Sequence, residues 1–97
     1  MKRLTVVIKP FKVEAVAKAL LEAGARSLTL SEARGYGRQK GHLELYRERS
    51  AEVTFLPKVR LECALDEGDL EGAIAAIIAA ARTGRIGDGK IWIEDLP

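Results

Sequence analysis

The chain has 97 residues, of which 47% are hydrophobic and 31% are charged. A chain of this length buries roughly 60–68% of the surface that its unfolded form exposes, so we expect one domain over residues 1–97. Basic residues exceed acidic residues by 16 − 14 = 2, which gives no reason to expect nucleic-acid binding. A single cysteine excludes a disulfide framework and a cysteine-based zinc site.

No segment of the sequence resembles a membrane anchor or a leader. The longest strongly apolar run, Ala73–Ala81, is far shorter than the roughly 20 residues that a membrane span needs. The start, Met1-Lys2-Arg3, leads into a short run ended by Lys9-Pro10, which does not fit a signal peptide. We therefore expect a cytoplasmic protein without membrane insertion.

The first half of the chain changes its apolar period twice. Residues 2–8 alternate apolar and polar side chains, which predicts a strand. From Val13 the apolar residues recur at helical spacing, and Gly24 predicts the end of that helix. Alternation returns at Leu28, which predicts a second strand running toward Gly35.

The second half predicts another strand and another helix. Alternation over residues 53–65 predicts the strand, and Pro57 predicts a bulge or a sheet edge because proline has no N–H to donate. Asp66 or Asp69 is expected to open the helix, and Gly84 to close it.

A last short strand around Ile91 and Ile93 completes the order β-α-β, long connection, β-α-β. This order predicts an α+β, ferredoxin-like double βαβ fold, in which a four-stranded antiparallel sheet carries two helices on one face. The other face of the sheet would expose enough apolar surface to suggest a partner subunit. Candidates for that face are Thr5, Val7, Thr29 and Trp92.

The long connection, residues 36–52, has no sustained period. Such connections are uncommon in compact domains and are usually functional or mobile. One interpretation is a solvated hairpin extension. The other is an arm that reaches a protein partner, because a phosphate backbone would favour a uniformly basic arm. Candidate contact residues in the arm are Lys40, His42, Glu44, Tyr46, Arg47 and Arg49.

Two glycine-rich basic segments are candidate anion sites. Residues 84–90 fit G-x-x-x-x-G-K, but Ile91 replaces the Ser or Thr and the segment joins a helix to a strand, so we reject a P-loop NTPase. A plain glycine-rich turn is the alternative. Residues 35–41 have Lys40 where the dinucleotide fingerprint needs a glycine. The two segments could converge within one chain or across subunits.

Catalytic constellations are absent from the sequence. His42 is the only histidine and Cys63 the only cysteine, so neither a metal-ligand spacing nor a nucleophile–base pair can be argued. Cys63 falls on the apolar side of a strand pattern, where core packing is expected. We do not expect an enzyme.

Five segments carry a family resemblance: Ile8–Lys12, Gly35–His42, Glu44–Arg47, Phe55–Val59 and Ala81–Ile91. They closely resemble the PII nitrogen-regulatory signal-transduction proteins over almost the whole chain. The resemblance implies a homotrimer of the ferredoxin-like fold, with ATP or ADP bound as effectors in the clefts between subunits. The arm, called the T-loop in that family, would dock onto a membrane transporter or a metabolic enzyme, most often in nitrogen regulation.

The resemblance also implies roles for single residues. Those expected around the phosphates are Gly35, Gly37, Arg38, Gln39, Gly87, Asp88, Gly89 and Lys90. Those expected around the adenine are Thr29, Glu62 and the Ala64 backbone. Gln39 would also help to hold Mg²⁺ and 2-oxoglutarate, and Lys58 would pair with the 2-oxoglutarate carboxylate.

The sequence departs from the family pattern at two places. Ala51 stands where regulated members carry a modified tyrosine, so no nucleotidylation is expected there. Typical members also supply two arginines beyond the last strand, where this sequence ends at Glu94-Asp95-Leu96-Pro97. Since each charge-assisted contact contributes about 1.5–3 kcal/mol, we expect weaker ATP binding, a preference for ADP or AMP, and a diminished response to 2-oxoglutarate.

Three alternatives to a nitrogen regulator remain open at this stage. One is a divergent sensor of ADP or AMP without a 2-oxoglutarate response, serving a metal-efflux or bicarbonate transporter. Another is a weak ATPase with Glu44 or Asp88 as its base. The last is a structural trimer without a ligand.

Overall fold

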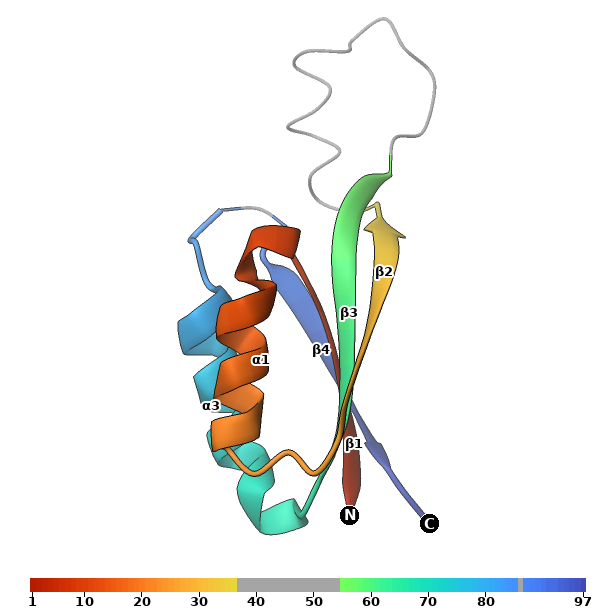
Figure 1. Cartoon of the computed structure of the whole chain (residues 1–97), viewed down its shortest axis with the longest axis vertical. Coiled ribbons are helices and arrows are strands. Elements are labelled where there is room, and N and C mark those ends of the chain that lie inside the picture. The colour runs from red at the N-terminus through yellow and green to blue at the C-terminus, as the bar shows by residue number, and fades with distance from the viewer. Residues whose placement is uncertain (37–54, 86) are drawn as a thin grey trace, which may run out of the picture.

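Four strands and two α-helices form the fold in the computed structural model, which describes residues 1–36, 55–85 and 87–97. Short 3-10 turns precede both helices, at Pro10–Lys12 and Glu67–Asp69. The elements in chain order are β1 (Lys2–Ile8), α1 (Val13–Glu22), β2 (Leu28–Gly35), β3 (Leu56–Leu65), α3 (Leu70–Ala81) and β4 (Gly89–Asp95) (Figure 1).

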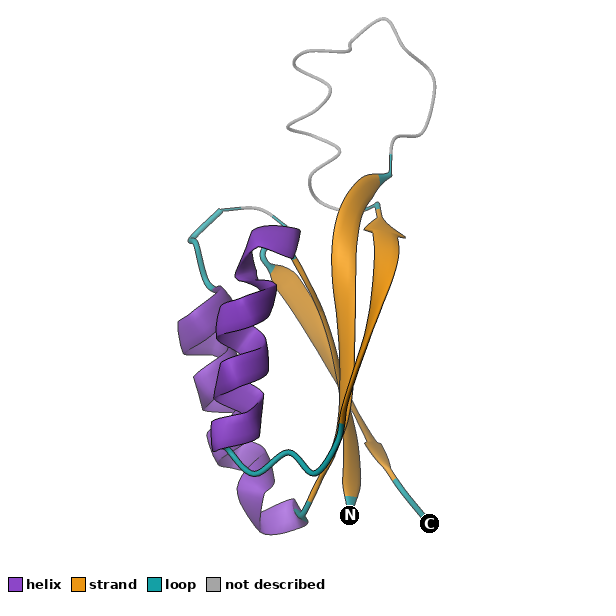
Figure 2. Ribbon diagram, viewed as in Figure 1, coloured by secondary structure: helices purple, strands orange, loops and turns teal. Residues whose placement is uncertain are grey.

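The strands lie in the order β2-β3-β1-β4, and every neighbouring pair is antiparallel. Both helices cover the same face of the sheet (Figure 2). The predicted ferredoxin-like double βαβ fold is therefore confirmed. The uncovered face, called the open face below, leaves β2 and β4 as the two edge strands.

The core lies between the sheet and the helices because the inner faces of the central strands are apolar at every second residue. Leu4, Val6 and Ile8 of β1 are at most 1% exposed. Their counterparts on β3 and the helices include Leu61, Cys63, Leu65, Val16, Leu20, Ala73 and Ile77. Each large apolar side chain buried in this way contributes roughly 1.5–3 kcal/mol. The expected burial of Cys63 is confirmed, and burial raises the pKa of its thiol.

Helix boundaries follow the predicted signals with one difference. Gly24 ends α1 with a φ of +107°, and a Cβ there would lie 2.8 Å from an Asp69 carboxylate oxygen, so glycine is required. Asp66 precedes the second 3-10 turn and Asp69 precedes α3, so each expected acid opens a helical segment. Gly84 does not close α3, which already ends at Ala81.

Pro57 lies in β3 without a bulge, because the register with β2 runs unbroken to the pair Gly35 and Leu56. The pairing of β3 with β1 ends at Val59, so Pro57 has a neighbouring strand on one side only. The expected local edge is confirmed, and the alternative of a bulge is wrong. Phe55 lies outside the strand, which begins at Leu56.

The two ends of the molecule differ in what they carry. Both chain termini lie at one end, and the loop between α3 and β4 lies at the other, together with the end of β2 and the start of β3 (Figure 1). The rings of Tyr36 and Phe55 lie 5.8 Å apart there and mark the base of the expected arm. The predicted arm residues Lys40, His42, Glu44, Tyr46, Arg47 and Arg49, and also Ala51, lie outside the described residues.

Candidate functional site

The loop between α3 and β4 is organised around the carboxylate of Asp88. One oxygen, Oδ2, accepts the backbone N–H groups of Thr83 at 2.8 Å and Gly84 at 3.0 Å. The other oxygen, Oδ1, accepts the Lys9 ammonium at 3.1 Å and the Thr83 hydroxyl. A carboxylate offers about four lone-pair sites, so these four donors fill it.

The Thr83 side chain extends the same network. Its hydroxyl donates to Asp88 and accepts hydrogen bonds from the Lys9 ammonium at 3.3 Å and from the Arg85 N–H at 3.1 Å. The amide groups of Thr83, Gly84 and Arg85 are therefore all used inside the loop. They are not available to a bound anion.

This network sets the charge state of Asp88. Burial disfavours the charged carboxylate, but the hydrogen bonds from Thr83, Lys9 and Gly84 outweigh burial and hold the pKa of Asp88 well below its usual range. A carboxylate held in this way stays ionised and does not accept a proton at neutral pH. It is a poor candidate for the general base of a weak ATPase.

Lys58 joins the two glycine-rich segments. Its residue is 7% exposed, and its ammonium donates to the Gly87 carbonyl oxygen at 2.8 Å. Its side chain also passes over Gly35, where a Cβ would lie 3.1 Å from Lys58 Cγ. The segments that contain Gly35 and Gly87 therefore converge within one chain.

Among the described residues, the buried Lys58 ammonium has the neutral Gly87 carbonyl as its one hydrogen-bond partner. No carboxylate of the described residues lies within ion-pair distance of it. Burial lowers the pKa of Lys58, the nearby charge of Lys9 lowers it further, and Asp88 acts in the opposite direction. An added anion would relieve this unfavourable environment.

Within the described residues, the loop leaves only a few donors for such an anion. The N–H groups of Gly87 and Asp88 have no recorded partner there. The loop sequence also supplies Arg82, Arg85 and Lys90 against the single carboxylate of Asp88, which is already engaged. Unpaired amides beside excess positive charge favour phosphate or carboxylate ligands.

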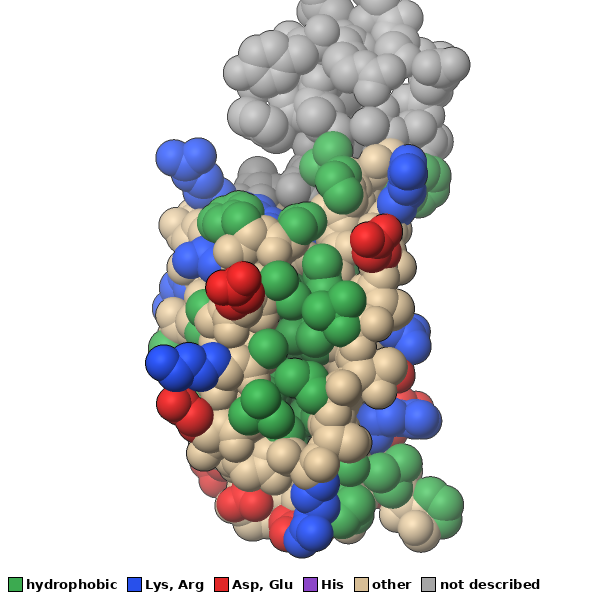
Figure 3. Space-filling view, viewed as in Figure 1, with side chains coloured by type: hydrophobic (Ala, Val, Ile, Leu, Met, Phe, Trp, Pro, Cys, Tyr) green, Lys and Arg blue, Asp and Glu red, His purple; other side chains and the backbone are tan. Residues whose placement is uncertain are grey.

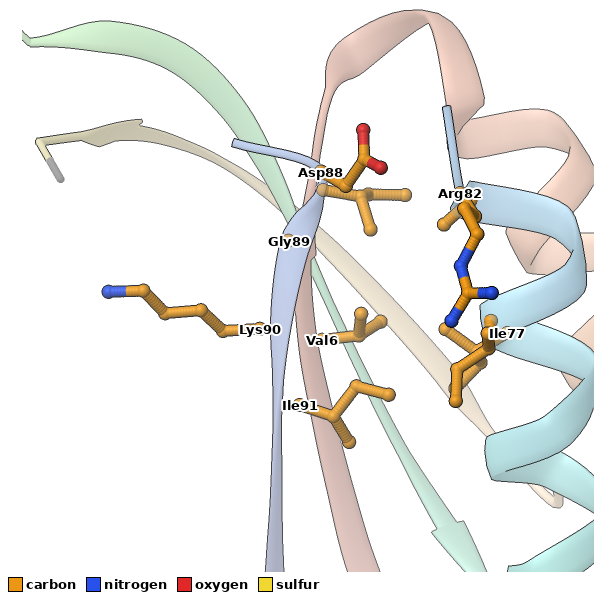
Figure 4. Close-up of a pocket in the computed structure, with 10 residues that line it drawn as sticks. Val6, Ile77, Arg82, Asp88, Gly89, Lys90 and Ile91 are labelled. Atoms are coloured by element: carbon orange, nitrogen blue, oxygen red, sulfur yellow. The ribbon is translucent and has the colours of Figure 1, made fainter. Parts of the chain in front are cut away.

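Gly89 and Lys90 are the first two residues of β4, where successive side chains face opposite sides of the sheet. Gly89 has a φ of +152°, and a Cβ there would lie 2.5 Å from the Val7 carbonyl oxygen. Lys90 extends away from the helices, whereas Val6, Ile77 and Ile91 line a pocket of about 310 Å³ between the sheet and α3 (Figure 4). The lining of this pocket is mostly apolar, and it also includes Arg82, Asp88, Gly89 and Lys90 at the loop end.

The residues expected around the adenine share the open face of the sheet. Thr29 lies directly opposite Glu62, and Thr5 lies opposite Glu62 on the other side. The Glu62 carboxylate accepts the Thr5 hydroxyl at 3.4 Å and pairs with Arg60 at 3.0 Å. The carbonyl of Ala64 accepts the Arg26 N–H at 3.0 Å and keeps a second lone pair.

Some predicted site residues cannot be compared with this geometry, and two participants had no predicted role. Gly37, Arg38 and Gln39 lie outside the described residues. Lys9 and Thr83 were not assigned to the site, although both are central to the Asp88 network. The sequence does contain a signal for both residues. Lys9 directly follows β1, and Thr83 directly precedes the glycine-rich segment that contains Asp88.

Neither a metal cluster nor a membrane helix is found in the described parts of the chain. No group of three or more His, Cys, Asp or Glu side chains there could hold a metal ion. No described helix is long and apolar enough to cross a membrane.

Comparison with known proteins identifies the family. The model of the family described as "Nitrogen regulatory protein P-II" matches residues 1–97. A nitrogen regulatory protein P-II of Mesorhizobium japonicum is 54% identical over 96 residues, which cover 99% of this chain and 86% of the relative. The P-II protein of Azospirillum brasilense is 53% identical, with coverage of 96% and 83%. The nitrogen regulatory protein GlnK of Escherichia coli is 50% identical, with coverage of 99% and 86%. This chain belongs to the nitrogen regulatory protein P-II family.

Proposed function

We propose that this chain is a signal-transduction regulator that binds an adenine nucleotide and passes the bound state to a target protein. The nucleotide would lie in the clefts of a homotrimer, and the arm at residues 36–52 would contact a membrane transporter or a metabolic enzyme. The observation that carries the proposal is the position of Lys58, a buried cation between the two glycine-rich segments.

The loop end of the molecule has the chemistry of a phosphate site. Lys58 lacks an acidic partner among the described residues, and the amides of Gly87 and Asp88 remain unpaired there. Lys90 would add a flexible cation on the open face. Thr29 and Glu62, on the same face, would offer a hydroxyl and a carboxylate to the adenine edge.

This arrangement is compatible with three adenine nucleotides as effectors. ATP, ADP and AMP share the adenosine monophosphate part and differ in the phosphates that reach the loop. Mg²⁺ would accompany ATP on its phosphates. Lys58 could also meet the carboxylate of 2-oxoglutarate, with Gln39 as the second expected contact. ADP or AMP without a 2-oxoglutarate response remains the alternative signal.

A homotrimer is supported by the surface that one chain leaves uncovered. Leu30 at the β2 edge is 55% exposed, and Trp92 on β4 is 48% exposed. Hydrophobic side chains also gather on the face seen in Figure 3, between α1 and the neighbouring part of the sheet. If the β2 edge of one copy meets the β4 edge of the next, both exposed edges become covered, and a threefold rotation between copies would close the ring.

Isothermal titration calorimetry of the full chain tests the proposed function. ATP, ADP and AMP are titrated with Mg²⁺, and the ATP titration is repeated with 2-oxoglutarate. We expect saturable binding of at least ATP or ADP at one site per chain. Lys90→Met should weaken nucleotide binding about tenfold, because one charge-assisted contact is lost. The matched control Lys18→Met, on the exposed surface of α1, should bind as the wild type does.

Each outcome of the titration has a distinct meaning. Heat from 2-oxoglutarate only in the presence of Mg²⁺ and ATP supports a nitrogen and energy sensor. Stronger binding of ADP or AMP, with no heat from 2-oxoglutarate, supports the divergent sensor and directs the search for targets toward metal-efflux or bicarbonate transporters. No binding of any nucleotide contradicts the proposal. Native mass spectrometry of the same sample tests the trimer.

A further inference from the structure

We infer that Asp88 is a positioning residue of the nucleotide site and that its carboxylate contacts neither phosphate nor metal. This inference rests on the proposed function and assigns a different role to the side chain of a residue that the family resemblance implies to be a phosphate contact. Asp88 would act through the backbone of residues 83–85 and 87–88, with Lys9 and Thr83 as its partners.

The saturation of the carboxylate excludes a direct contact. Two donors lie on each oxygen of Asp88: Thr83 N–H and Gly84 N–H on Oδ2, and the Lys9 ammonium and Thr83 hydroxyl on Oδ1. No lone-pair site remains for Mg²⁺. Phosphate is itself an acceptor and would be repelled by this carboxylate.

The network also determines which amides of the loop stay available. Thr83 and Gly84 direct their N–H groups to the carboxylate, and Arg85 directs its N–H to the Thr83 hydroxyl. The N–H groups of Gly87 and of Asp88 itself remain, and Lys58 holds the Gly87 carbonyl from the opposite side. The side chain of Asp88 therefore orders the turn, and the backbone of the same residue is free to meet the ligand.

Lys9 has a second consequence for the site. Its ammonium lies close enough to Lys58 to lower the affinity of Lys58 for its proton, and Asp88 pairs with Lys9 at 3.1 Å. Asp88 therefore offsets the charge of Lys9, so that of these two lysines only Lys58 lacks an acidic partner among the described residues. Loop geometry and charge are set by the same carboxylate.

The test uses the full chain with Asp88→Asn, Thr83→Val and the conservative variant Thr83→Ser. Asp95→Asn is the matched control, because Asp95 also pairs with a lysine of β1 but lies at the other end of β4. Two quantities are measured: the exchange rates of the Thr83, Gly84 and Arg85 amides without ligand, and the Kd for ADP with and without Mg²⁺.

We expect Asp88→Asn to accelerate exchange of the Thr83 and Gly84 amides about tenfold or more and to weaken ADP binding by a similar factor, equally with and without Mg²⁺. Thr83→Val should change both quantities in the same direction by a smaller factor, which keeps the test usable if Asp88→Asn does not fold. Thr83→Ser should restore wild-type values, because it keeps the hydroxyl. Asp95→Asn should change neither quantity.

Two results would overturn the inference. A loss of affinity seen only with Mg²⁺, at unchanged amide exchange, would make Asp88 a metal contact. Faster exchange with unchanged ADP affinity would show that loop order does not matter for binding. A wild-type chain that binds none of ATP, ADP and AMP contradicts the proposed function instead. The exchange rates would then still show whether Asp88 holds the loop.

Discussion

Strands β1 and β4 are linked by a lysine–aspartate pair at each end, and the two pairs have different surroundings. At the end with the termini, Lys2 pairs with Asp95, whose side chain is 83% exposed. At the loop end, Lys9 pairs with Asp88, whose side chain is 25% exposed. Within the part of the chain that the structure describes, the Asp95 side chain has Lys2 as its one hydrogen-bond partner, whereas Asp88 also accepts three hydrogen bonds from Thr83 and Gly84.

The comparison separates two uses of the same chemical pair. An exposed pair in water contributes little to stability, because solvent and salt screen the charges. A carboxylate with four donors in a half-buried loop fixes the backbone, because losing it would leave several polar groups unsatisfied. The denser hydrogen-bond network therefore lies at the loop end of β1 and β4, beside the candidate anion site.

The largest effect is expected from Gly89→Ala, at the loop end of the β1–β4 pair. The new Cβ would lie 2.5 Å from the Val7 carbonyl oxygen, and the φ of +152° is strained for alanine. We expect the free energy of unfolding to fall by about 3 kcal/mol or more in urea titrations. The control Gly72→Ala, where nothing lies within 4 Å of the new Cβ, should add about 0.5–1 kcal/mol. Equal losses in the free energy of unfolding for the two variants would contradict the close packing of Gly89 against β1.

Asp88→Asn and Asp95→Asn compare the two pairs directly. Asparagine keeps the shape of the side chain but loses the negative charge to which the Lys9 ammonium and the Thr83 hydroxyl donate. We expect Asp88→Asn to lower the free energy of unfolding by about 1–3 kcal/mol. Asp95→Asn should produce a clearly smaller change. Similar losses at both ends would mean that exposure does not distinguish the pairs.

Acid pH should reveal the same difference. The fold holds the pKa of Asp88 below that of an unfolded aspartate, so its stabilising contribution is present above about pH 3.9. That contribution is lost as the pH falls through the native pKa, because the unfolded chain then binds the proton more readily. Free energies of unfolding measured from neutral pH down to about pH 3 should therefore fall less steeply in Asp88→Asn than in the wild type. Parallel curves would contradict the assigned role.

The smallest effect on stability is expected at Lys58. Burial lowers the pKa of Lys58, which means that the fold disfavours its charged form. Lys58→Met keeps the length and apolar stem, so the free energy of unfolding at neutral pH should change by less than about 1 kcal/mol. The wild type should gain stability as the pH rises from the native pKa toward about 10.4, and the variant should lack this gain. A large loss at neutral pH would make Lys58 a structural residue.

Much of the fold could be predicted because its signals are local. The alternation of residues 2–8 gives β1 with its observed bounds, and the helical spacing from Val13 to Gly24 gives α1 and its end. Pro57 was ambiguous between a bulge and an edge. The choice depends on where β1 stops beside β3, which is a tertiary property.

The site was predicted less completely, because its contacts join distant positions. Lys9 and Asp88 are separated by 79 positions, and Lys58 and Gly87 by 29. Glycine and basic residues identified the segments 35–41 and 84–90 in the sequence. The sequence pattern gave no sign that the Asp88 side chain binds the backbone of its own loop. The register of β1 and β4 determines that geometry, since Ile8 lies opposite Gly89.

An amide NMR titration of the full chain with ADP tests directly whether the loop between α3 and β4 holds the nucleotide phosphates. We expect the resonances of Gly87 and Asp88 to shift on binding, along with those of Thr29 and Glu62, while the Thr83 and Gly84 amides keep their slow exchange. If ADP shifts the resonances of other residues and leaves those of Gly87 and Asp88 unchanged, the nucleotide binds elsewhere and the proposed site is wrong.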